Sequence, residues 1–141
     1  MKSTVIFRDF TGNIFQSFTI PLHSWIIDCV QAEGYKPGEI LISFYSDEFV
    51  HELNLEFLNH NTLTDIITFD YSVEKFISGE IYISVDRVRE NAINFDQDFP
   101  FELKRIIIHG ILHLVGYNDK TPEQKMQMSA KEDYYLSLLP I

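Results

Sequence analysis

Several short stretches of the chain alternate hydrophobic and polar residues with a period of two, the pattern of strands that have one buried face. The alternation is clear over residues 4–9 and weaker over residues 13–20, with Thr11-Gly12-Asn13 between them. This arrangement predicts a β-hairpin at the start of the chain. Three further strands are predicted at residues 40–45, 65–71 and 79–84.

Other stretches have the three-to-four-residue spacing of amphipathic helices. Pro21 begins the first of them and Gly34 follows its end, while Thr121, Pro122 and Gln124 form a capping-box start for the last. Helices are predicted over residues 21–33, 47–58, 86–94, 98–115 and 121–139.

Strands and helices therefore alternate along the chain, which predicts an α/β or α+β fold with one sheet of about four strands packed by about five helices. The 141 residues contain no repeat and no long Pro/Gly/Ser linker. A second hydrophobic core would not fit beside the first. We expect one domain over residues 1–141.

Composition narrows the functions that this fold could serve. The net charge of −10 comes from 21 acidic residues against 11 Lys and Arg, which argues against a broad nucleic-acid-binding surface. If nucleic acid is the substrate, a local basic patch, a metal ion or a partner must overcome this repulsion. No stretch approaches the ~18 apolar residues of a membrane span, and the first residues lack the apolar run of a signal peptide.

The single cysteine cannot form an internal disulfide, so nothing suggests a secreted, cross-linked fold. Cys29 lies in an apolar stretch and is expected to be a buried space-filler rather than a reactive thiol. These features together predict a cytoplasmic protein.

The candidate chemistry lies near the end of the fourth predicted helix. His109 and His113 are four residues apart, and four residues advance a helix by about 6 Å and about 400°, so both imidazoles project from one face. Gly116 ends the helix, which allows Asp119 to return toward that face. Two histidines and one carboxylate with an open position are typical of a catalytic metal site.

A simpler interpretation is that both histidines are core residues bonded to backbone and that Asn118-Asp119 is an ordinary turn. Two imidazoles one turn apart are harder to explain in this way, because each needs partners for both nitrogens. The pattern therefore favours a metal site.

Gly110 occupies the position of the general-base Glu in zinc proteases with the His-Glu-x-x-His motif. Two alternatives remain for the proton: the metal lowers the pKa of bound water toward ~7 unaided, or the substrate itself accepts the proton. We also expect the glycine to leave space for a bulky or charged substrate.

Residues 109–119 resemble the signature of the YbeY family of bacterial metal-dependent endoribonucleases, His-Gly-x-x-His-Leu-x-Gly-Tyr-Asp-His. The resemblance extends upstream. Leu53-Asn54 followed by residues 64–69 is similar to the family's Leu-Asn … Thr-Asp-Val-Leu-Ser-Phe, and residues 79–84 are similar to its Gly-Asp-Ile-x-Ile-Ser strand. Order, spacing and length agree over nearly the whole chain.

The resemblance implies an α/β fold with a mixed sheet and one bound zinc ion, held here by His109, His113 and Asp119. It implies cleavage of single-stranded RNA in ribosomal RNA maturation and ribosome quality control, with the small ribosomal subunit as partner. Because no stretch is apolar enough to span a membrane, no membrane association is predicted, and the sequence predicts no particular oligomeric state.

Two positions depart from the family pattern. Asp119 replaces the third ligand histidine, which keeps an acceptable zinc ligand but shifts the preference toward harder metals. Leu58 stands where the family usually carries an arginine associated with activity, so a group able to grip phosphate is missing. The candidates to replace this arginine are Arg87, Arg89, Lys104 and Arg105. For all four, a place on an exposed helix face is the simpler interpretation.

Several other residues have an ordinary and a functional interpretation. Asp65 either lines the cleft or caps a turn. Phe69, Tyr71 and Tyr117 supply core, or stack a base near the site. The isolated histidines, expected to be ordinary surface or core residues, are His23, His51 and His60.

Two other functions compete with RNA cleavage. A metallopeptidase or other metal-dependent hydrolase fits the negative charge and the missing arginine, although Gly110 counts against a protease. A ribosome-assembly binding module with a structural metal would need a fourth protein ligand.

Overall fold

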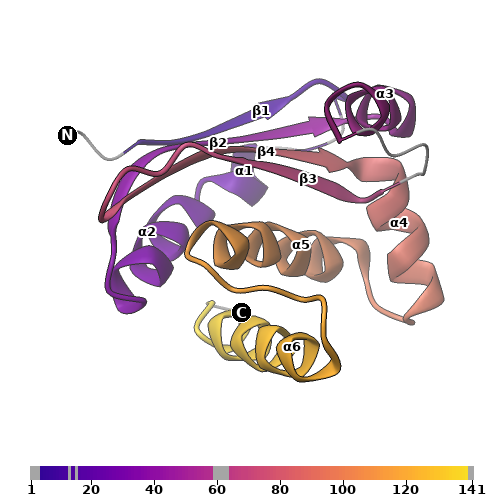
Figure 1. Cartoon of the computed structure of the whole chain (residues 1–141). Helices are drawn as coiled ribbons and strands as arrows, with labels where there is room; N and C mark the ends of the chain where they lie inside the picture. The colour runs from indigo at the N-terminus through magenta and orange to yellow at the C-terminus, as the bar shows by residue number, and fades with distance from the viewer. Residues whose placement is uncertain (1–3, 13, 15, 59–63, 140–141) are drawn as a thin grey trace.

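The computed structural model describes residues 4–12, 14, 16–58 and 64–139 (Figure 1). These residues form a four-stranded sheet in the order β1-β2-β4-β3. Strands β1 (Thr4–Asp9) and β4 (Phe76–Ser84) each pair in parallel with β2 (Lys36–Tyr45), and β3 (Ile66–Asp70) pairs antiparallel with β4. The predicted α/β class, with one mixed sheet of about four strands, is confirmed.

The helices form two layers on one face of the sheet, and other helices lie at its end. Within the described residues they are α1 (Gln16–Thr19), α2 (Leu22–Ala32), α3 (Asp47–Leu58), α4 (Val85–Asn94), α5 (Phe99–Leu114) and α6 (Pro122–Ser137). In Figure 1, α2 and α5 cover one face of the sheet and α6 lies beyond α5 as a third layer, whereas α3 lies at the other face near one end. The five predicted helices are all present, with ends shifted by a few residues; the one-turn helix α1 was not predicted.

The predicted N-terminal hairpin is wrong. Strand β1 pairs in parallel with β2, and the chain after it enters α1 instead of a second strand. The carboxylate of Asp9 accepts hydrogen bonds from the backbone N–H groups of Thr11 and Ile14, at 2.9 and 2.7 Å, which turns the chain away from β1. Ile14, before α1, and Phe18, within it, both pack against the core.

The core lies between the sheet and the layer of α2 and α5. Alternate residues over 40–44 of β2 and 81–83 of β4 are fully buried aliphatic or aromatic side chains, and α5 presents a matching row; examples are Ile42, Phe44, Ile81, Ile83, Ile107, Ile108 and Ile111. Each such side chain contributes about 1.5–3 kcal/mol when it leaves water. Cys29 is buried as predicted, and burial raises the pKa of its thiol to about 12.

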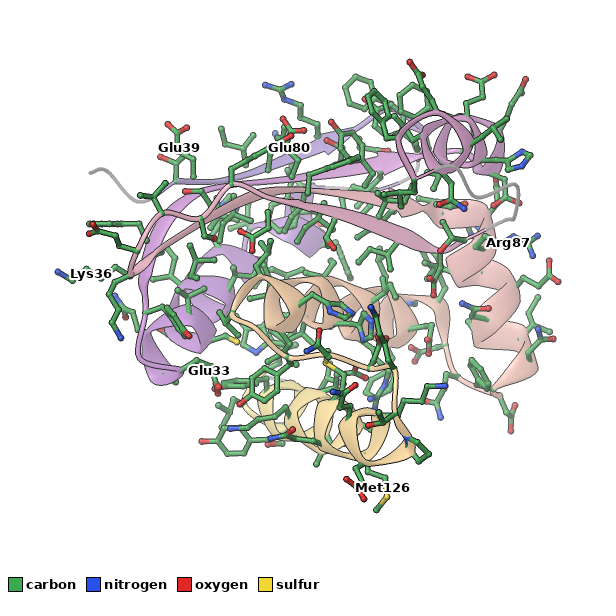
Figure 2. The ribbon with its side chains drawn as sticks, in the orientation of Figure 1. Glu33, Lys36, Glu39, Glu80, Arg87 and Met126 are labelled. Atoms are coloured by element: carbon green, nitrogen blue, oxygen red, sulfur yellow. The ribbon has the colours of Figure 1, made fainter. Side chains whose placement is uncertain are left out.

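The outer face of the sheet is more polar and more aromatic than the inner face. Glu39 and Glu80 project from it, away from α5 (Figure 2). Tyr45 stacks on Phe10 and Phe49, with ring centroids 4.5 and 4.0 Å apart. Among the helices of the described residues, none combines the length and the apolar character that crossing a membrane requires.

Candidate metal centre

Helix α5 brings His109 and His113 to the same side, as their spacing predicts. Asp98 caps the start of the helix by accepting from the N–H of Phe101 at 2.9 Å, and Pro100 lies in its first turn. One turn apart, the two rings have centroids 4.6 Å apart, and their Nε2 atoms are separated by 3.0 Å. The two Nε2 atoms therefore converge on one point beside the helix.

The helix ends in a motif that returns the chain to this point. Gly116 has a φ of +108°, a conformation that glycine adopts without a steric penalty. The N–H of Tyr117 donates to the carbonyl of Leu112 at 3.0 Å, and the N–H of Gly116 donates to the carbonyl of His113 at 3.1 Å. This pair of bonds is the Schellman arrangement, and it reverses the chain. The predicted stop at Gly116 is confirmed.

The reversal carries Asp119 back to the histidines. Its Oδ2 lies 3.3 Å from Nε2 of His109 and 3.5 Å from Nε2 of His113. Sequence reasoning placed these three residues together, and the structure brings them together. All three side chains are partly exposed, so the group is accessible from outside.

The other nitrogen of each ring identifies the tautomer. His109 Nδ1 lies 2.6 Å from Oε2 of Glu132, and His113 Nδ1 lies 3.0 Å from the carbonyl oxygen of Tyr117. A carboxylate and a carbonyl only accept hydrogen bonds, so in the neutral rings the proton is on Nδ1 in both cases. Both Nε2 atoms then present lone pairs to each other and to the Asp119 carboxylate.

Three electron-rich atoms that face each other without a proton between them repel, and a cation removes this repulsion. The ligands of a tetrahedral zinc ion at about 2.0–2.1 Å are about 3.3–3.4 Å apart. The measured separations of 3.0, 3.3 and 3.5 Å bracket this value. The group of His109, His113 and Asp119 could therefore hold a divalent ion.

The ligand atoms of these three residues all lie within 4.8 Å of one another. Within the described part of the chain, no other three residues of the types His, Cys, Asp or Glu come so close together, and no fourth such residue joins His109, His113 and Asp119. Glu132, the nearest further carboxylate bonded to the group, contacts the opposite nitrogen of His109. Three protein ligands are the arrangement of catalytic zinc sites, whereas structural sites close with four.

Acidic neighbours surround the site and shift its pKa values. Burial by itself lowers the pKa of His109, but the hydrogen bond to Glu132 and the charges of Glu132 and Asp119 outweigh it, so the pKa is raised. Burial raises the pKa of Asp65, and the interaction with His109 and a hydrogen bond from Asn91 offset this only in part. Asp65 is thus close enough to His109 for their charges to interact.

A second cluster supports the loop that carries Asp119. Glu33, at the end of α2 where that helix approaches α6 (Figure 2), accepts hydrogen bonds from the hydroxyls of Tyr117 and Tyr135 and from Lys131. Tyr117 donates at 2.6 Å. Lys131 also lies over the Tyr117 ring, 5.8 Å from its centroid. The loop is therefore tied to both α2 and α6.

The structure corrects the expectation that Gly110 opens space for a substrate. A Cβ atom on Gly110 would lie 2.9 Å from Cδ1 of Ile66 and 3.1 Å from Cδ1 of Ile81, so this position faces the sheet. The glycine allows α5 to pack closely on β3 and β4. A glutamate at position 110 would clash with this packing. Position 110 therefore cannot carry the general base of the zinc proteases.

Each of the four basic candidates for the missing arginine has an acidic or aromatic partner of its own. Arg87 pairs with Asp47 and Glu90, and Arg105 pairs with Glu132 and Asp133. Arg89 lies over the ring of Phe99, 4.3 Å from its centroid, and Lys104 lies over the ring of Phe18 at 5.6 Å. Leu58 ends α3 with 43% of its surface exposed.

Of the aromatic candidates for base stacking, only Tyr117 lies at the site, where its hydroxyl is bonded to Glu33. Phe69 contacts Tyr82 on the outer face of the sheet, opposite α5, and Tyr71 is exposed on that face. The prediction that Phe69 and Tyr71 lie near the site is therefore wrong. His23 packs edge-on against Phe7, and His60 lies outside the described residues.

Sequence reasoning missed Glu132 and Glu33. Glu132 follows Met128 by four residues and precedes Tyr135 by three, so it lies on the buried stripe of α6. A carboxylate within an otherwise apolar stripe is a signal that could have found it. Glu33 gives no comparable signal, because its partners are 84 or more residues away.

The class of protein that fold and site define is an α/β fold with a group of two histidines and one aspartate, near the end of a helix, that could hold a metal ion. The family model described as "Endoribonuclease YbeY" matches residues 15–139. The protein named "Endoribonuclease YbeY" from Flavobacterium johnsoniae is 44% identical over 89% of this chain and 88% of its own length. Its namesake from Flavobacterium psychrophilum is 46% identical over 84% of both chains.

Among solved structures, the solution structure of TM1509 from Thermotoga maritima is similar, with a TM-score of 0.69 and 27% identity. The match covers 95% of this chain and 87% of that one. The chain belongs to the YbeY endoribonuclease family.

Proposed function

We propose that this chain is a metal-dependent endoribonuclease of ribosomal RNA maturation, with one zinc ion bound by His109, His113 and Asp119. The observation that carries the proposal is the convergence of three lone-pair-bearing atoms, two Nε2 and one Oδ2, at mutual distances of 3.0–3.5 Å. The endoribonuclease names of the relatives supply the reaction class. Residues 1–141 act as one metallohydrolase domain.

The chain's own residues contribute binding and orientation. His109 and His113 offer Nε2, and the backbone of the Gly116 turn holds Asp119 against them. A bound divalent ion would supply an acidified water or a polarised phosphate oxygen. Position 110 faces the sheet and supplies no base, so a proton lost by such a water would pass to solvent or to the substrate. Attack by the RNA 2′-hydroxyl is the alternative.

RNA affinity is the weak point of this chain. A net charge of −10, Leu58 in place of arginine and the ion-paired Arg87 and Arg105 leave few cations for phosphates. We therefore propose that single-stranded ribosomal RNA is bound with help from the small ribosomal subunit, in the cytoplasm. Ribosome quality control is part of the same proposal.

The test is cleavage of a labelled single-stranded RNA by the wild type and by His113→Ala, at low and moderate salt and with or without small ribosomal subunits. The metal content of each protein is measured in parallel. We expect one zinc ion per wild-type chain, slow cleavage that falls as salt rises, and loss of both properties in His113→Ala. Substitution of His23 by Gln, a histidine on α2 away from the site, should preserve both.

Equal cleavage by wild type and His113→Ala would identify a contaminating nuclease and contradict the proposal. Turnover of a peptide or small ester without any RNA cleavage would favour the general-hydrolase alternative. Full metal occupancy in the double variant His109→Ala/His113→Ala would rule out this site.

A further inference from the structure

Helix α6 contributes a buried carboxylate to the candidate metal centre. Glu132 is 6% exposed, and its Oε2 lies 2.6 Å from Nδ1 of His109. A buried carboxylate is costly unless it is paired, and Arg105 provides the pairing by donating to Oε1 at 2.9 Å. The two oxygens of Glu132 thus have separate tasks, one toward the arginine and one toward the histidine.

The rest of α6 docks through few apolar contacts. Its buried residues are Met128, Glu132 and Tyr135. Polar bonds complete the docking: the indole N–H of Trp25 donates to the backbone carbonyl of Tyr135 at 2.8 Å, and Lys131 pairs with Glu33. A helix with so small an apolar face depends on its polar contacts for its position.

We propose that Glu132 is a positioning residue of the metal centre, which holds His109 in the tautomer whose Nε2 faces His113 and Asp119 and thereby links the docking of α6 to metal binding. The proposal rests on the proposed metal site. Its physical basis is that a ligating imidazole needs an acceptor on its other nitrogen to fix both the ring plane and the proton.

The inference separates Glu132 from a carboxylate that merely pairs with Arg105. Asp133 also pairs with Arg105, at 2.6 Å from its other terminal nitrogen, but makes no bond to His109 and is 67% exposed. Asp133→Asn is therefore the matched control for Glu132→Gln. Both variants remove one carboxylate charge from Arg105, but only Glu132→Gln changes the group that faces His109. Because Arg105 can only donate, it draws the single amide oxygen of the glutamine, which leaves the donor NH2 toward Nδ1 of His109.

The experiment measures zinc affinity by competition with a chelator, together with the tautomer of His109 in the metal-free protein by ¹⁵N-resolved NMR of the imidazole nitrogens. We expect Glu132→Gln to weaken zinc binding by about 10–100-fold and to reduce the population of the Nδ1–H form. Asp133→Asn should stay within about twofold of wild type, with the tautomer unchanged. A purely structural role would move neither readout in a folded protein.

If the wild type binds zinc and Glu132→Gln binds it with the same affinity, the role of Glu132 is overturned and the proposed metal site is not. No zinc binding by the wild type would contradict the proposed function, and the role toward an ion would fall with it.

If Glu132→Gln does not fold, amide hydrogen exchange of the wild type provides the test. Added zinc should slow exchange in α6 through the link from the ion to His109 and Glu132. Identical exchange in α6 with and without bound zinc would overturn the proposal.

Discussion

The two histidines of the candidate metal centre come from the same face of α5 but are held in different ways. His109 bonds to the side chain of Glu132, which arrives from α6 and is itself held by Arg105. His113 bonds to the backbone carbonyl of Tyr117, four residues later in the same segment. One support is long-range and made of side chains, and the other is local and made of backbone.

This difference determines how the position of each histidine responds to substitution. The support of His109 can be removed by changing one side chain on another helix. The support of His113 persists in any sequence that preserves the Gly116 turn, because a backbone carbonyl is present whatever the side chain. The His109 side is therefore the more sensitive to changes elsewhere in the molecule.

The largest effects come from removing a ligand. Either His109→Ala or His113→Ala should lower zinc affinity by more than ~100-fold, beyond the ~10–100-fold typical of losing a group that only orients a ligand. Isothermal titration with zinc measures this. If one of the two variants keeps wild-type affinity, the corresponding imidazole is not a ligand.

A second prediction concerns pH. Zinc binding displaces protons from the imidazoles, and the pKa of His109 is raised, so affinity should begin to fall while the pH is still above the ordinary His value of ~6.5. One displaced proton corresponds to about 100-fold between about pH 7 and pH 5. Affinities measured at several pH values check this.

The raised pKa of His109 has the opposite pH dependence for the stability of the metal-free protein: zinc affinity rises with pH, whereas this contribution to stability falls. A raised pKa in the folded state contributes stability below the ordinary His value, and this contribution is lost as the pH rises through the raised value. The difference in unfolding free energy between metal-free wild type and His109→Gln should therefore shrink as pH rises. A difference that grows would contradict the direction of the shift.

A third prediction tests the ligand beyond the turn. Asp119→Ala should lower zinc affinity about tenfold or more, whereas Asp119→His should retain the ion, because the Gly116 turn decides which position reaches it. Competition with a chelator measures both variants. Wild-type affinity in Asp119→Ala would place the third ligand elsewhere.

A fourth prediction concerns Asp65, whose pKa is raised because its carboxylate is partly desolvated. A carboxylate with a raised folded-state pKa costs stability above that pKa and costs nothing well below its unfolded value. Metal-free Asp65→Asn should therefore be more stable than wild type at about pH 7, a gain that vanishes in acid, while its zinc affinity falls by less than ~10-fold. Thermal unfolding with a chelator present measures the gain, and equal stabilities at neutral pH would contradict it.

The smallest effect on the metal is expected from Tyr117→Phe. The substitution removes the hydroxyl that donates to Glu33 at 2.6 Å but keeps the carbonyl that accepts from His113. Unfolding free energy should fall by about 1.5–3 kcal/mol, the usual range for a hydrogen bond to a charged group. Zinc affinity should stay within about threefold. A larger loss of affinity would mean that the His113 side also depends on side chains.

The prediction of elements succeeded where local patterns were sufficient. The i,i+4 spacing of His109 and His113, the stop at Gly116 and the capping box at Thr121 each depend on a few neighbouring residues, and the structure has all three. The N-terminal hairpin failed because part of the weak alternation over residues 13–20 forms the short helix α1 instead of a strand. Strand β1 pairs instead with β2, some 35 positions away, and no local pattern indicates this pairing.

The sequence by itself determined the two-histidine helix, the turn beyond it and the acid that completes the group, because each follows from the geometry of a helix and one glycine. Only the tertiary structure decided that Gly110 faces the sheet, that Phe69 lies on the opposite face from the site, and that Glu132 lies against Nδ1 of His109. These facts depend on which faces of separate elements meet. That choice is made by burial of apolar surface and pairing of buried charge over the whole chain, and no local pattern encodes it.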